Sequence, residues 1–490
     1  MEGRAAWAGP ESKAIPLGRG VKKCPAGGGN GRVAAPVLDS RGAPRYSMGR
    51  TIDPARPQRE PRSAMKLIIF EDAKYDDLYP LTYLRPVFEL RCGVTSLREK
   101  IEHAVPAESV ACFVRDWLAE AYAEKTEAPV NDPAQLDGDA LLVNGRLLVD
   151  GTCDLTKLGP DEAVRVGDTL VAANVTAATL AAAKADSFDA TLTALDAKLK
   201  TAQCCAGGCE LTMIDAPWLL IRHNAAMMES DFARLYRDRA GVHGELHETS
   251  CILGDSGDVY IAPTAQVAPQ VVLDATEGPI ILEEDVKVLP HTRVEGPHYS
   301  GRGTQLHGGK IREACSFGPM CRVGGEVECA ILQGYSNKYH DGFLGHSYVG
   351  EWVNLGAMTT NSDLKNDYST VSVYFKGQLT DTGEQFLGAM IGDHTKTSIG
   401  TILNTGSMIG MMSNLVFSGP LMPKEVPSFC WMLNGRPTKG TGFKGMLATA
   451  KAAMGRREKE MSEAEETLIR HVRDLLKDDL RAAIKRAFKR

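Results

Sequence analysis

The sequence lacks the features that mark membrane, secreted and nucleic-acid-binding proteins. No apolar run reaches the roughly 18 residues that a bilayer-spanning helix requires. Lys and Arg number 56 against 62 Asp and Glu, a net charge of -6, so there is no overall basic surface for nucleic acid. The 12 Cys are scattered, and no secretory signal peptide precedes them. These absences predict a cytoplasmic protein with reduced thiols that binds neither membrane nor nucleic acid.

Aromatic residues are also scarce, at 6%, whereas glycine is abundant, with 49 among 490 residues. The hydrophobic content of 43% is enough to bury a core, and the length predicts about two or three domains. Residues 1–64 are rich in Gly, Pro and Arg, without a periodic apolar segment. They are predicted to be a disordered tail or to precede the true start of the protein. Their Gly and Pro content disfavours a transit peptide.

A pattern of strands and helices follows over residues 65–245. KLIIFED is typical of the buried first strand of a parallel α/β sheet, and ALLVNGRLLV of a second strand. Ser96 and Glu99 have the spacing of a capping box that begins a helix. DTLVAANVTAATLAAAKA and APWLLIRHNAAMMESDFARLYRDR have helical composition. The alternation predicts an α/β, Rossmann-like layer domain.

Between residues 251 and 436, apolar residues recur every six positions. The runs are Ile261, Val267 and Leu273; Phe317 and Val323; Phe343, Val349 and Leu355; and Ile391, Leu403, Ile409 and Leu415. Such hexads predict a parallel β-helix of triangular section, in which each unit supplies one side and its apolar residue points inward. At about 18 residues per coil, up to about ten coils are possible. The phase breaks between Asn361 and Phe386, which predicts a functional loop that projects from the prism.

Residues 437–490 are predicted to be helical. Ser462 and Glu465 form a capping-box pattern. An apolar stripe at helical spacing contains Leu468, Val472, Leu475, Leu476, Leu480 and Ile484. The stripe predicts packing across the end of the β-helix or against another subunit.

The densest group of polar residues is GYSNKYHDGFLGHSYVGEWVNLGAMTTNSDLKND, residues 334–367. His340 and Asn361 are about one coil plus half a side apart, so they can lie on neighbouring coils near one edge. An imidazole accepts the proton of an attacking amine and an amide orients that amine, so the pair suits amide formation from an amine and a thioester. Lys338 and Lys365 add positive charge for a phosphate.

These residues carry a resemblance. The polar segment, together with PLTYLRPVFELRCG and IGDHTKTSIGTILNTGSMIG, resembles a divergent bacterial branch of the bifunctional N-acetylglucosamine-1-phosphate uridyltransferases and glucosamine-1-phosphate acetyltransferases. The resemblance covers roughly residues 65–435. It implies a left-handed β-helix acyltransferase domain, a homotrimer with active sites between subunits, and acetyl-CoA as the acyl donor. A sugar phosphate and a nucleoside triphosphate are the implied substrates.

The resemblance also implies roles for individual residues. His340, three positions before Phe343, takes the place of the family's general base, and Asn361 that of an asparagine. Phe343 stands where the family has a tyrosine that contacts the sugar phosphate, so the hydroxyl is lost. Acyl-CoA is expected along the coils around Ala357 and Thr401.

The first domain departs further from the family. It has FEDAKYDDLYPLTYLRP where sugar-phosphate nucleotidyltransferases have a Gly-rich phosphate-binding loop. Arg85, Arg91 and Lys100 are candidates for phosphate binding, although ion pairs that fix the loop explain the two arginines equally well. Asn144 stands where the family places a Mg²⁺-binding aspartate, and a neutral amide is a weaker ligand. Either Asp72 binds Mg²⁺ instead, or nucleotidyl transfer is weak or absent.

Three interpretations of function follow. The first is an acetyl-CoA-dependent N-acetyltransferase of an amino sugar phosphate, fused to a divergent sugar-1-phosphate nucleotidyltransferase. The second is an acyltransferase whose N-terminal domain only senses sugar nucleotides. The third is a zinc-dependent hydratase on a β-helix that uses His340, His346 and His394. The six-residue spacing of His340 and His346 disfavours the third, because it places them on different sides of the triangle.

The cysteines form no obvious metal site. QCCAGGC, with Cys204, Cys205 and Cys209, lacks the paired CxxC spacing of zinc ligands. A second group of cysteines is predicted to fill the narrow interior of the prism as small apolar side chains: Cys315, Cys321 and Cys329.

Overall fold

The structure of the protein is a computed structural model that describes residues 65–150, 154–202, 211–416, 419 and 421–489. The predicted tail, residues 1–64, and the cluster Cys204, Cys205 and Cys209 lie outside the described residues. No helix within these described ranges combines the length and apolarity that a membrane crossing needs.

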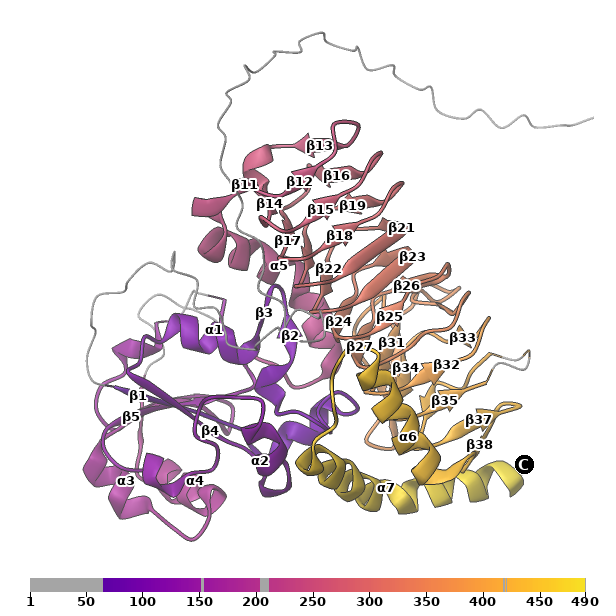
Figure 1. Ribbon diagram of the computed structural model, residues 1–490. Helices are drawn as coiled ribbons and strands as arrows, with labels where there is room; N and C mark the ends of the chain where they lie inside the picture. The colour runs from indigo at the N-terminus through magenta and orange to yellow at the C-terminus, as the bar shows by residue number, and fades with distance from the viewer. Residues whose placement is uncertain (1–64, 151–153, 203–210, 417–418, 420, 490) are drawn as a thin grey trace, which may run out of the picture. The chain divides into compact units, whose positions relative to one another are not determined.

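The first part of the described chain is an α/β layer built on a mixed six-stranded sheet (Figure 1). Its strands, in spatial order, are β4 (Ser109–Phe113), β1 (Lys66–Phe70), β5 (Ala140–Asn144), β8 (Thr169–Val175), β7 (Glu162–Val166) and β9 (Lys200–Thr201). The first three are parallel, as predicted, whereas β8 runs antiparallel to both of its neighbours. The short strands β6 (Leu147–Leu148) and β10 (Thr212–Met213) pair beside the sheet. The helices are α1 (Leu97–Ala104), α2 (Asp116–Ala123), α3 (Ala177–Ala183), α4 (Phe188–Asp196) and α5 (Pro217–Leu235).

The helical prediction for the segment that begins at Asp168 is wrong in its first half. Strand β8 is buried along most of its length between β5 and β7, so its apolar run has no polar alternation to reveal a strand. Gly167 has a φ of +58°, in the left-handed region that glycine favours, and it turns the chain from β7 into β8. The helix begins only at Ala177, where Thr176 caps it. The capping box at Ser96 and α5 are confirmed.

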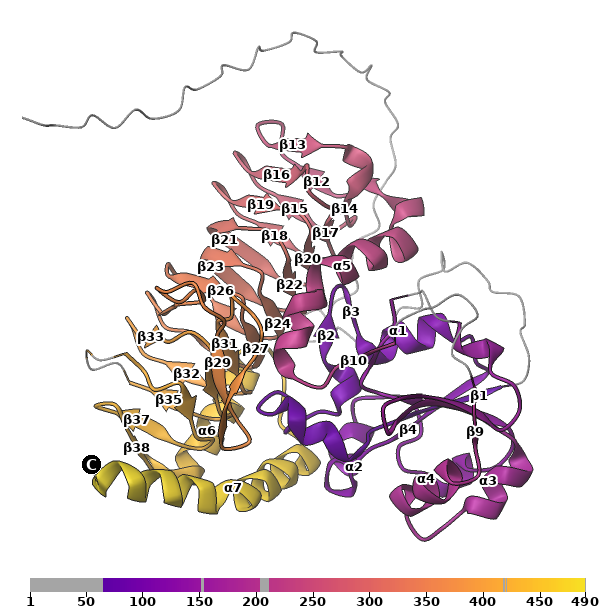
Figure 2. The same cartoon turned by 180° about the vertical axis from the view of Figure 1, so that it is seen from behind.

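The predicted β-helix is confirmed, with strands stacked in parallel on three faces (Figures 1 and 2). The first face has ten strands: β11 (Gly241–Val242), β14 (Val259–Ile261), β17 (Ile280–Leu282), β20 (His298–Ser300), β22 (Cys315–Phe317), β24 (Ile331–Gly334), β27 (Tyr348–Glu351), β31 (Ala389–Ile391), β34 (Ser407–Ile409) and β36 (Glu425–Val426). The first strand of this face lies before residue 251, where the sequence places the start of the β-helix. The predicted ends of the α/β domain at residue 245 and of the β-helix at residue 436 stay predictions.

Long strands β21 (Gln305–Ile311) and β23 (Arg322–Glu328) each run along both other faces. The second face also holds β12 (Glu245–Leu246), β15 (Gln266–Val267), β18 (Lys287–Val288), β25 (Asn337–Lys338), β32 (Lys396–Thr397), β35 (Asn414–Leu415) and β37 (Trp431–Leu433), which pairs with β38 (Arg436–Thr438). The third face holds β13 (Cys251–Gly254), β16 (Val272–Ala275), β19 (Arg293–Glu295), β26 (Phe343–Gly345), β28 (Thr360–Asn361) and β33 (Ile402–Leu403).

The hexad residues fill the prism with one exception. Ile261, Phe317 and Ile409 are fully buried, as are most of the others. In β26, however, Leu344 takes the inward position opposite Val327, and Phe343 is only half-buried. The sequence therefore predicts the wrong inward residue in this strand, Phe343 in place of Leu344. Leu344 is also apolar, so the interior of the prism is still filled.

The long break in the hexads does not project from the prism. It contains the antiparallel hairpin of β29 (Ser372–Phe375) and β30 (Gln378–Asp381). Val371 and Val373 are fully buried in a cluster with Met390 and Met408 of the first face. The hairpin therefore folds back over that face, beside β31 (Figure 2), because its alternate apolar side chains need cover.

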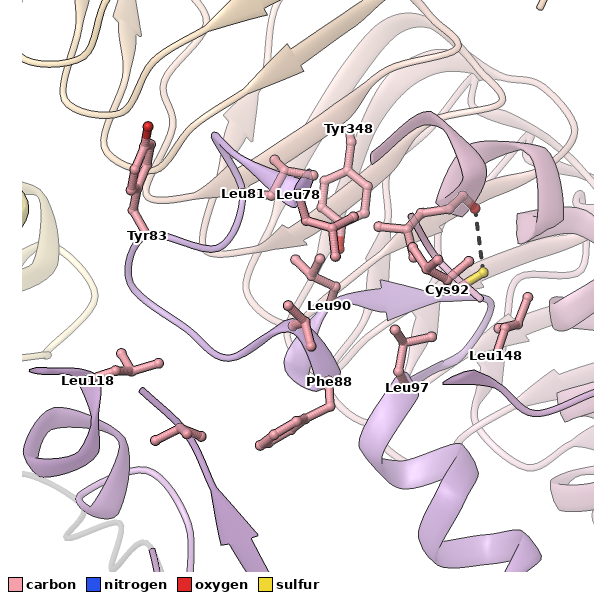
Figure 3. Close-up of a cluster of buried hydrophobic side chains, with 14 of the residues drawn as sticks. Leu78, Leu81, Tyr83, Phe88, Leu90, Cys92, Leu97, Leu118, Leu148 and Tyr348 are labelled. Carbon is pink, nitrogen blue, oxygen red and sulfur yellow. Dashed lines mark hydrogen bonds between the residues drawn. The ribbon is translucent and has the colours of Figure 1, made fainter. Parts of the chain in front are cut away.

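The segment that leads from η1 (Ala73–Leu78) to β2 (Arg91–Cys92) and β3 (Thr95–Ser96) also packs against the first face. In Figure 3, Leu78, Leu81 and Leu90 gather around Tyr348 of β27. The Tyr348 hydroxyl accepts a 2.9 Å hydrogen bond from the backbone of Arg91. The phrase PLTYLRPVFELRCG thus builds the contact between the α/β layer and the β-helix.

Two helices, α6 (Gly442–Gly455) and α7 (Glu463–Lys489), complete the described chain. The capping box at Ser462 and Glu465 is present, with the Glu465 backbone N–H 3.0 Å from the Ser462 hydroxyl. Leu468 and Val472 of the predicted stripe are buried, whereas Leu475 is 53% exposed. Helix α7 contacts both α2 and β38, so it packs across the end of the β-helix as predicted (Figure 1).

Candidate functional site

His340 lies at the corner between the second and third faces of the β-helix. Strand β25 ends at Lys338 and β26 begins at Phe343, so the intervening turn brings His340 to the surface. Its ring lies 4.9 Å from the Tyr339 ring. An exposed imidazole can exchange protons with a bound substrate, which is the property that a general base needs.

Lys338 supports this turn from inside. Its side chain is 2% exposed, and its ammonium donates hydrogen bonds to the backbone carbonyls of Gly324, at 2.9 Å, and His340. Burial lowers the pKa of Lys338 to about 8. The ammonium of Lys338 thus stabilises the turn and does not point to the surface, where a phosphate could bind.

Asn361 is also an internal residue. It is 5% exposed, and its amide forms a reciprocal pair of hydrogen bonds with the backbone N–H and C=O of Gly345, at 2.9 and 3.0 Å. The pair ties β28 to the coil that carries Phe343. The two predicted catalytic residues therefore lie on neighbouring coils, but only His340 reaches the surface.

The remaining residues predicted on the β-helix are spread along neighbouring coils. Lys365 donates to the Ser369 hydroxyl and, at 3.2 Å, to the Thr370 carbonyl. The Ala357 carbonyl accepts a 2.8 Å hydrogen bond from Gly400, which keeps that coil in register. Thr401 is fully buried and donates to the Ser398 carbonyl.

Large apolar side chains are exposed along the corner that carries His340. Tyr339 is 45% exposed, Met358 57% and Ile399 73%. The backbone N–H of Met358 bonds to the carbonyl of Asp341, and Gly400 bonds to Ala357, so these positions follow one another on successive coils. A row of exposed apolar groups is typical of a surface that a ligand or another subunit covers.

Sequence reasoning missed a second polar group, at the corner between the third and first faces. Nδ1 of His346 lies 2.9 Å from Oδ2 of Asp363, and the ring stacks on Phe386 with 5.2 Å between centroids. Cys329 is at the same corner and is half-buried, in contrast to the buried Cys315 and Cys321. The available signal was the spacing, since Cys329, His346 and Asp363 are 17 residues apart, one coil each.

The three histidines of the hydratase hypothesis do not converge. His340 and His346 lie at different corners, and His394 is buried among the Arg85 contacts at the third corner. Among the described residues, the one group with metal-ligand spacing is Glu313, Glu328 and Cys329, which includes none of these histidines.

In the α/β layer, Asp72 and Asn144 meet at the carboxyl ends of β1 and β5. The Asn144 amide donates a 2.8 Å hydrogen bond to Oδ2 of Asp72. Arg146, which the sequence did not single out, is fully buried and pairs with both Asp72 and Asp215. Although burial acts to raise the pKa of Asp72, the hydrogen bonds and charge of Arg146 hold it below its usual value.

This arrangement does not fit a magnesium ion at Asp72. Its Oδ1 accepts from Arg146 Nε, at 2.9 Å, and from the Lys74 backbone, while Oδ2 accepts from Asn144 and Arg146. Mg²⁺ needs carboxylate oxygens that are free to enter an octahedral shell. Here the guanidinium of Arg146 donates hydrogen bonds to both oxygens of the Asp72 carboxylate and supplies the local positive charge.

Arg85, Arg91 and Lys100 all have internal partners. Arg85 pairs with Asp393 at 2.8 Å and Glu351 at 3.2 Å. The Arg91 guanidinium donates to the Val94 carbonyl and lies 5.2 Å from the centre of the Tyr299 ring. Lys100 is fully buried and pairs with Asp231. The ion pairs of Arg85 match the alternative stated above for the two arginines, and none of the three cations lies at the edge where Asp72 lies.

Comparisons with known proteins agree with this architecture. The family model described as "Sugar nucleotidyl transferase" matches residues 67–240. The chain is 31% identical over 154 residues, 31% of its length and 38% of the relative's, to a bifunctional sugar-1-phosphate nucleotidylyltransferase/acetyltransferase of Sulfurisphaera tokodaii. It is also 31% identical over 121 residues to the bifunctional protein GlmU of Acidithiobacillus ferrooxidans, covering 24% of this chain and 25% of that relative.

Among solved structures, a Francisella novicida UDP-N-acetylglucosamine acyltransferase matches with 13% identity and a TM-score of 0.24, over 45% of this chain and 73% of that one. The matched segments span less than half the length of the two bifunctional relatives. Residues 67–240 thus match a family model of sugar nucleotidyl transferases, and part of the chain is similar to part of a bifunctional sugar-1-phosphate nucleotidylyltransferase/acetyltransferase.

Proposed function

We propose that the protein is a transferase of sugar-nucleotide biosynthesis that moves an acetyl group from acetyl-CoA to the amine of an amino sugar phosphate. The observation that carries the proposal is one chain in which a sugar nucleotidyl transferase domain precedes a β-helix with an exposed histidine at a coil corner. The relative from Sulfurisphaera tokodaii named above combines these two activities in its name. This pathway would place the protein in the cytoplasm.

In this proposal His340 is the general base. It accepts the proton of the amine as nitrogen attacks the thioester carbon. The bond between that carbon and the sulfur of CoA breaks, and the departing thiolate takes the proton from His340. Lys338 and Asn361 act as positioning residues, because their hydrogen bonds fix the turn and strand beside His340. Lys365 is the remaining candidate for the phosphate, and Phe343 offers an apolar surface.

The acyl donor would lie along the corner that carries His340. The exposed Tyr339, Met358 and Ile399, with Ala357 and Thr401 beneath them, support an apolar track for the pantetheine arm. In a homotrimer, a neighbouring subunit would also contact this row of side chains. The acyl donor would then lie between two subunits.

We propose that the first domain binds a sugar 1-phosphate and a nucleoside triphosphate at the edge formed by Asp72, Asn144 and Arg146. Arg146 is the cation at this edge, and a phosphate would reach it by replacing Asp215, whose side chain is 52% exposed, as its partner. Mg²⁺ remains a prediction from the resemblance, with Asp72 disfavoured as its ligand. The pairing of Asp72 with Arg146 favours a second candidate function, in which this domain binds the nucleotide without transferring it.

Substitution of His340 tests the acyltransferase proposal. His340→Ala should lower acetyl-CoA-dependent thiol release on amino sugar phosphates by at least about 100-fold, the usual contribution of a general base. His291→Ala is the matched control, because His291 is an exposed histidine at the same corner, on an earlier coil. Equal activity of His340→Ala and the control would refute the role of His340.

A further inference from the structure

Two arginines lie close together on the outside of the second face of the β-helix. Arg322 of β23 precedes the fully buried Val323, so its side chain points away from the interior of the prism. It pairs with Asn337 of β25 on the next coil. Arg457, in the turn that follows α6, donates a 3.0 Å hydrogen bond to Oδ1 of Asn337. Asn337 is therefore a neighbour of both arginines.

A histidine lies beside these arginines on the preceding coil, since β21, β23 and β25 follow one another along the prism (Figure 1). His307 of β21 pairs with Gly324 of β23, and the His307 ring lies 4.0 Å from the ring of Tyr339, between centroids. Gly324 has no side chain to separate the two rings, and an added Cβ would meet the backbone of both residues. Tyr339 also contacts the ring of His340, at 4.9 Å between centroids. The arginines and His307 therefore adjoin the proposed general base.

The positive charges of Arg322, Arg457 and His307, here called the basic group, act on one another. Burial and Arg457 lower the pKa of Arg322, and burial and Arg456 lower the pKa of Arg457. Burial also lowers the pKa of His307, and Arg322 and His340 lower it further. Cationic side chains that repel one another in this way attract an anion to the surface between them.

The guanidinium of Arg322 is fixed but not neutralised. Its Nη1 donates hydrogen bonds to three backbone carbonyls, two at 2.9 Å and one at 3.3 Å. No carboxylate within the described ranges forms an ion pair with Arg322 or Arg457. Asp341, in the adjoining turn, acts instead on Lys338, where burial lowers the pKa of the ammonium and Asp341 acts to raise it. The positive charge of the two arginines is thus available to a ligand.

The ring of His307 also lacks a partner. Its Nε2 is shielded from solvent and has no hydrogen-bond partner in the part of the chain that the structure describes, and the same holds for Nε of Arg457. A polar atom that is buried without a partner costs free energy, which an acceptor placed beside the ring would recover. The ring can turn toward such an acceptor without breaking a hydrogen bond of Nε2.

Two guanidinium groups and an imidazole without a counter-ion are suited to a phosphate. Guanidinium groups bind phosphate through charge-assisted hydrogen bonds in a fixed geometry. We infer that the basic group binds the phosphate of the amino sugar phosphate that accepts the acetyl group. The identity of this ligand rests on the proposed function, whereas the affinity for phosphate rests on the basic group alone. The basic group replaces Lys365 as the phosphate site, because the Lys365 ammonium already donates to the Ser369 hydroxyl and the Thr370 carbonyl.

The order of the coils favours the acceptor over the acyl donor as the source of the phosphate. Arg322 and His307 lie on the coils before that of His340. The residues proposed for the acyl donor, Ala357 and Thr401, lie on coils after it. With the donor on one side of His340, the acceptor amine reaches the base from the other side.

The direct test measures binding to the full chain without acetyl-CoA. Glucosamine 1-phosphate and inorganic phosphate are titrated calorimetrically into the wild type and into Arg322→Gln and Arg457→Gln. Each substitution should weaken the binding of both ligands at least about tenfold, because it removes a charged hydrogen-bond donor. Arg293→Gln is the matched control and should bind as the wild type does, since Arg293 is an exposed arginine of the third face that pairs with Asp274 and Glu295.

Thermal melts of the same variants show whether each one is folded. Arg457→Gln leaves the bonds from Arg322 to the backbone intact, so it provides the test if Arg322→Gln does not fold. Wild-type affinity for phosphate in the folded arginine variants, or loss of binding in Lys365→Gln alone, would overturn the proposal.

Steady-state kinetics distinguish the two sources of phosphate. Arg457→Gln should raise the KM for glucosamine 1-phosphate at least about tenfold and leave the KM for acetyl-CoA unchanged. A rise in the KM for acetyl-CoA alone would overturn the assignment to the acceptor. Phosphate binding that depends on the arginines, without any acetyl transfer, would refute only the proposed function. Acetyl transfer with wild-type KM values in Arg322→Gln and Arg457→Gln would refute only the role of the basic group.

Discussion

Individual residues of the site are held largely by the backbone of the β-helix. Lys338, although 2% exposed, donates hydrogen bonds to two backbone carbonyls, and no carboxylate in the described part of the chain is among its hydrogen-bonding partners. An ammonium buried in this way loses more hydration than the carbonyls return, which explains why its pKa falls to about 8. This cost should appear in the pH dependence of stability.

We predict that Lys338 makes the protein more stable as the pH rises from about 8 to about 10. The pKa of Lys338 is about 8 in the folded protein and about 10.4 in the unfolded chain, so the unfolded chain binds more protons in this window. Its contribution to the free energy of unfolding should rise by up to about 1.4 kcal/mol per pH unit. Denaturant unfolding at several pH values should show a smaller slope in Lys338→Met than in the wild type. Lys396, whose pKa burial also lowers to about 8, should contribute to the slope that remains.

The control is Lys310→Met, because the Lys310 side chain is 75% exposed. It should unfold with the wild-type pH dependence. If Lys338→Met also retained that dependence, the ammonium of Lys338 would be hydrated in the folded protein, and the burial argument would fail.

At the scale of elements, the hairpin β29–β30 shows how an insertion becomes part of the core. Val371 and Val373 alternate inward and are fully buried, whereas Leu379 on the second strand is 62% exposed. The buried side chains cover Met390 and Met408 of the first face, and Trp218 of α5 packs on Phe375 with 5.5 Å between ring centroids. The insertion thus connects α5 with the β-helix.

Truncation of this hairpin should therefore cost stability. Val373→Ala is expected to lower the free energy of unfolding by roughly 1 to 3 kcal/mol, because it removes buried methyl groups and leaves a cavity. Leu379→Ala, on the partner strand, should change it by less than about 0.5 kcal/mol. Denaturant melts of the two variants make the comparison, and equal effects would show that the hairpin does not pack on the first face.

The elements divide into those that local sequence patterns predict and those that need the whole fold. The hexads predict the β-helix because each inward position, such as Ile261 or Ile409, repeats the same local demand for an apolar side chain. The capping boxes at Ser96 and Ser462 are local for the same reason. Strand β8 and the packed hairpin were missed, since burial by distant segments decides both.

The same distinction applies to the candidate site. The position of His340 in an exposed turn followed from the break between hexads. The internal partners of Lys338, Asn361 and Lys100 did not, because Gly324, Gly345 and Asp231 approach only in the folded chain. The polar group of Cys329, His346 and Asp363 also needs the coil length of 17 residues. The coil length varies along the β-helix from 15 residues between Ser316 and Ile331 to 42 between Tyr348 and Met390, where the coil contains the hairpin.

At the scale of the whole molecule, buried polar contacts join the α/β layer to the β-helix. Arg85 reaches Asp393 and Glu351 at one corner of the coils. Gln333 donates a 2.8 Å hydrogen bond to the Glu89 carbonyl, and the Ser316 hydroxyl donates one to Gly93 at 2.6 Å. Arg85, first considered for phosphate binding, therefore holds two parts of the chain together.

Loss of Arg85 should weaken the whole protein. Arg85→Met leaves the carboxylate of Asp393 buried without its cation, which should lower the free energy of unfolding by about 3–5 kcal/mol. Arg222→Met breaks another contact to the β-helix region, with Glu384, but the Arg222 side chain is 45% exposed, so its loss should cost less than about 1 kcal/mol. Thermal melts of both variants test the difference, and an unaffected Arg85→Met protein would contradict the account of this contact.

The central claim, transfer of an acetyl group to an amino sugar phosphate, is tested most directly by one assay. Purified protein is incubated with acetyl-CoA, amino sugar phosphates and each nucleoside triphosphate, and free thiol and pyrophosphate are followed together. We predict thiol release that requires an amino sugar phosphate and that persists when EDTA removes divalent metal. Absence of thiol release with every amino sugar phosphate, whether or not pyrophosphate forms, would contradict the claim.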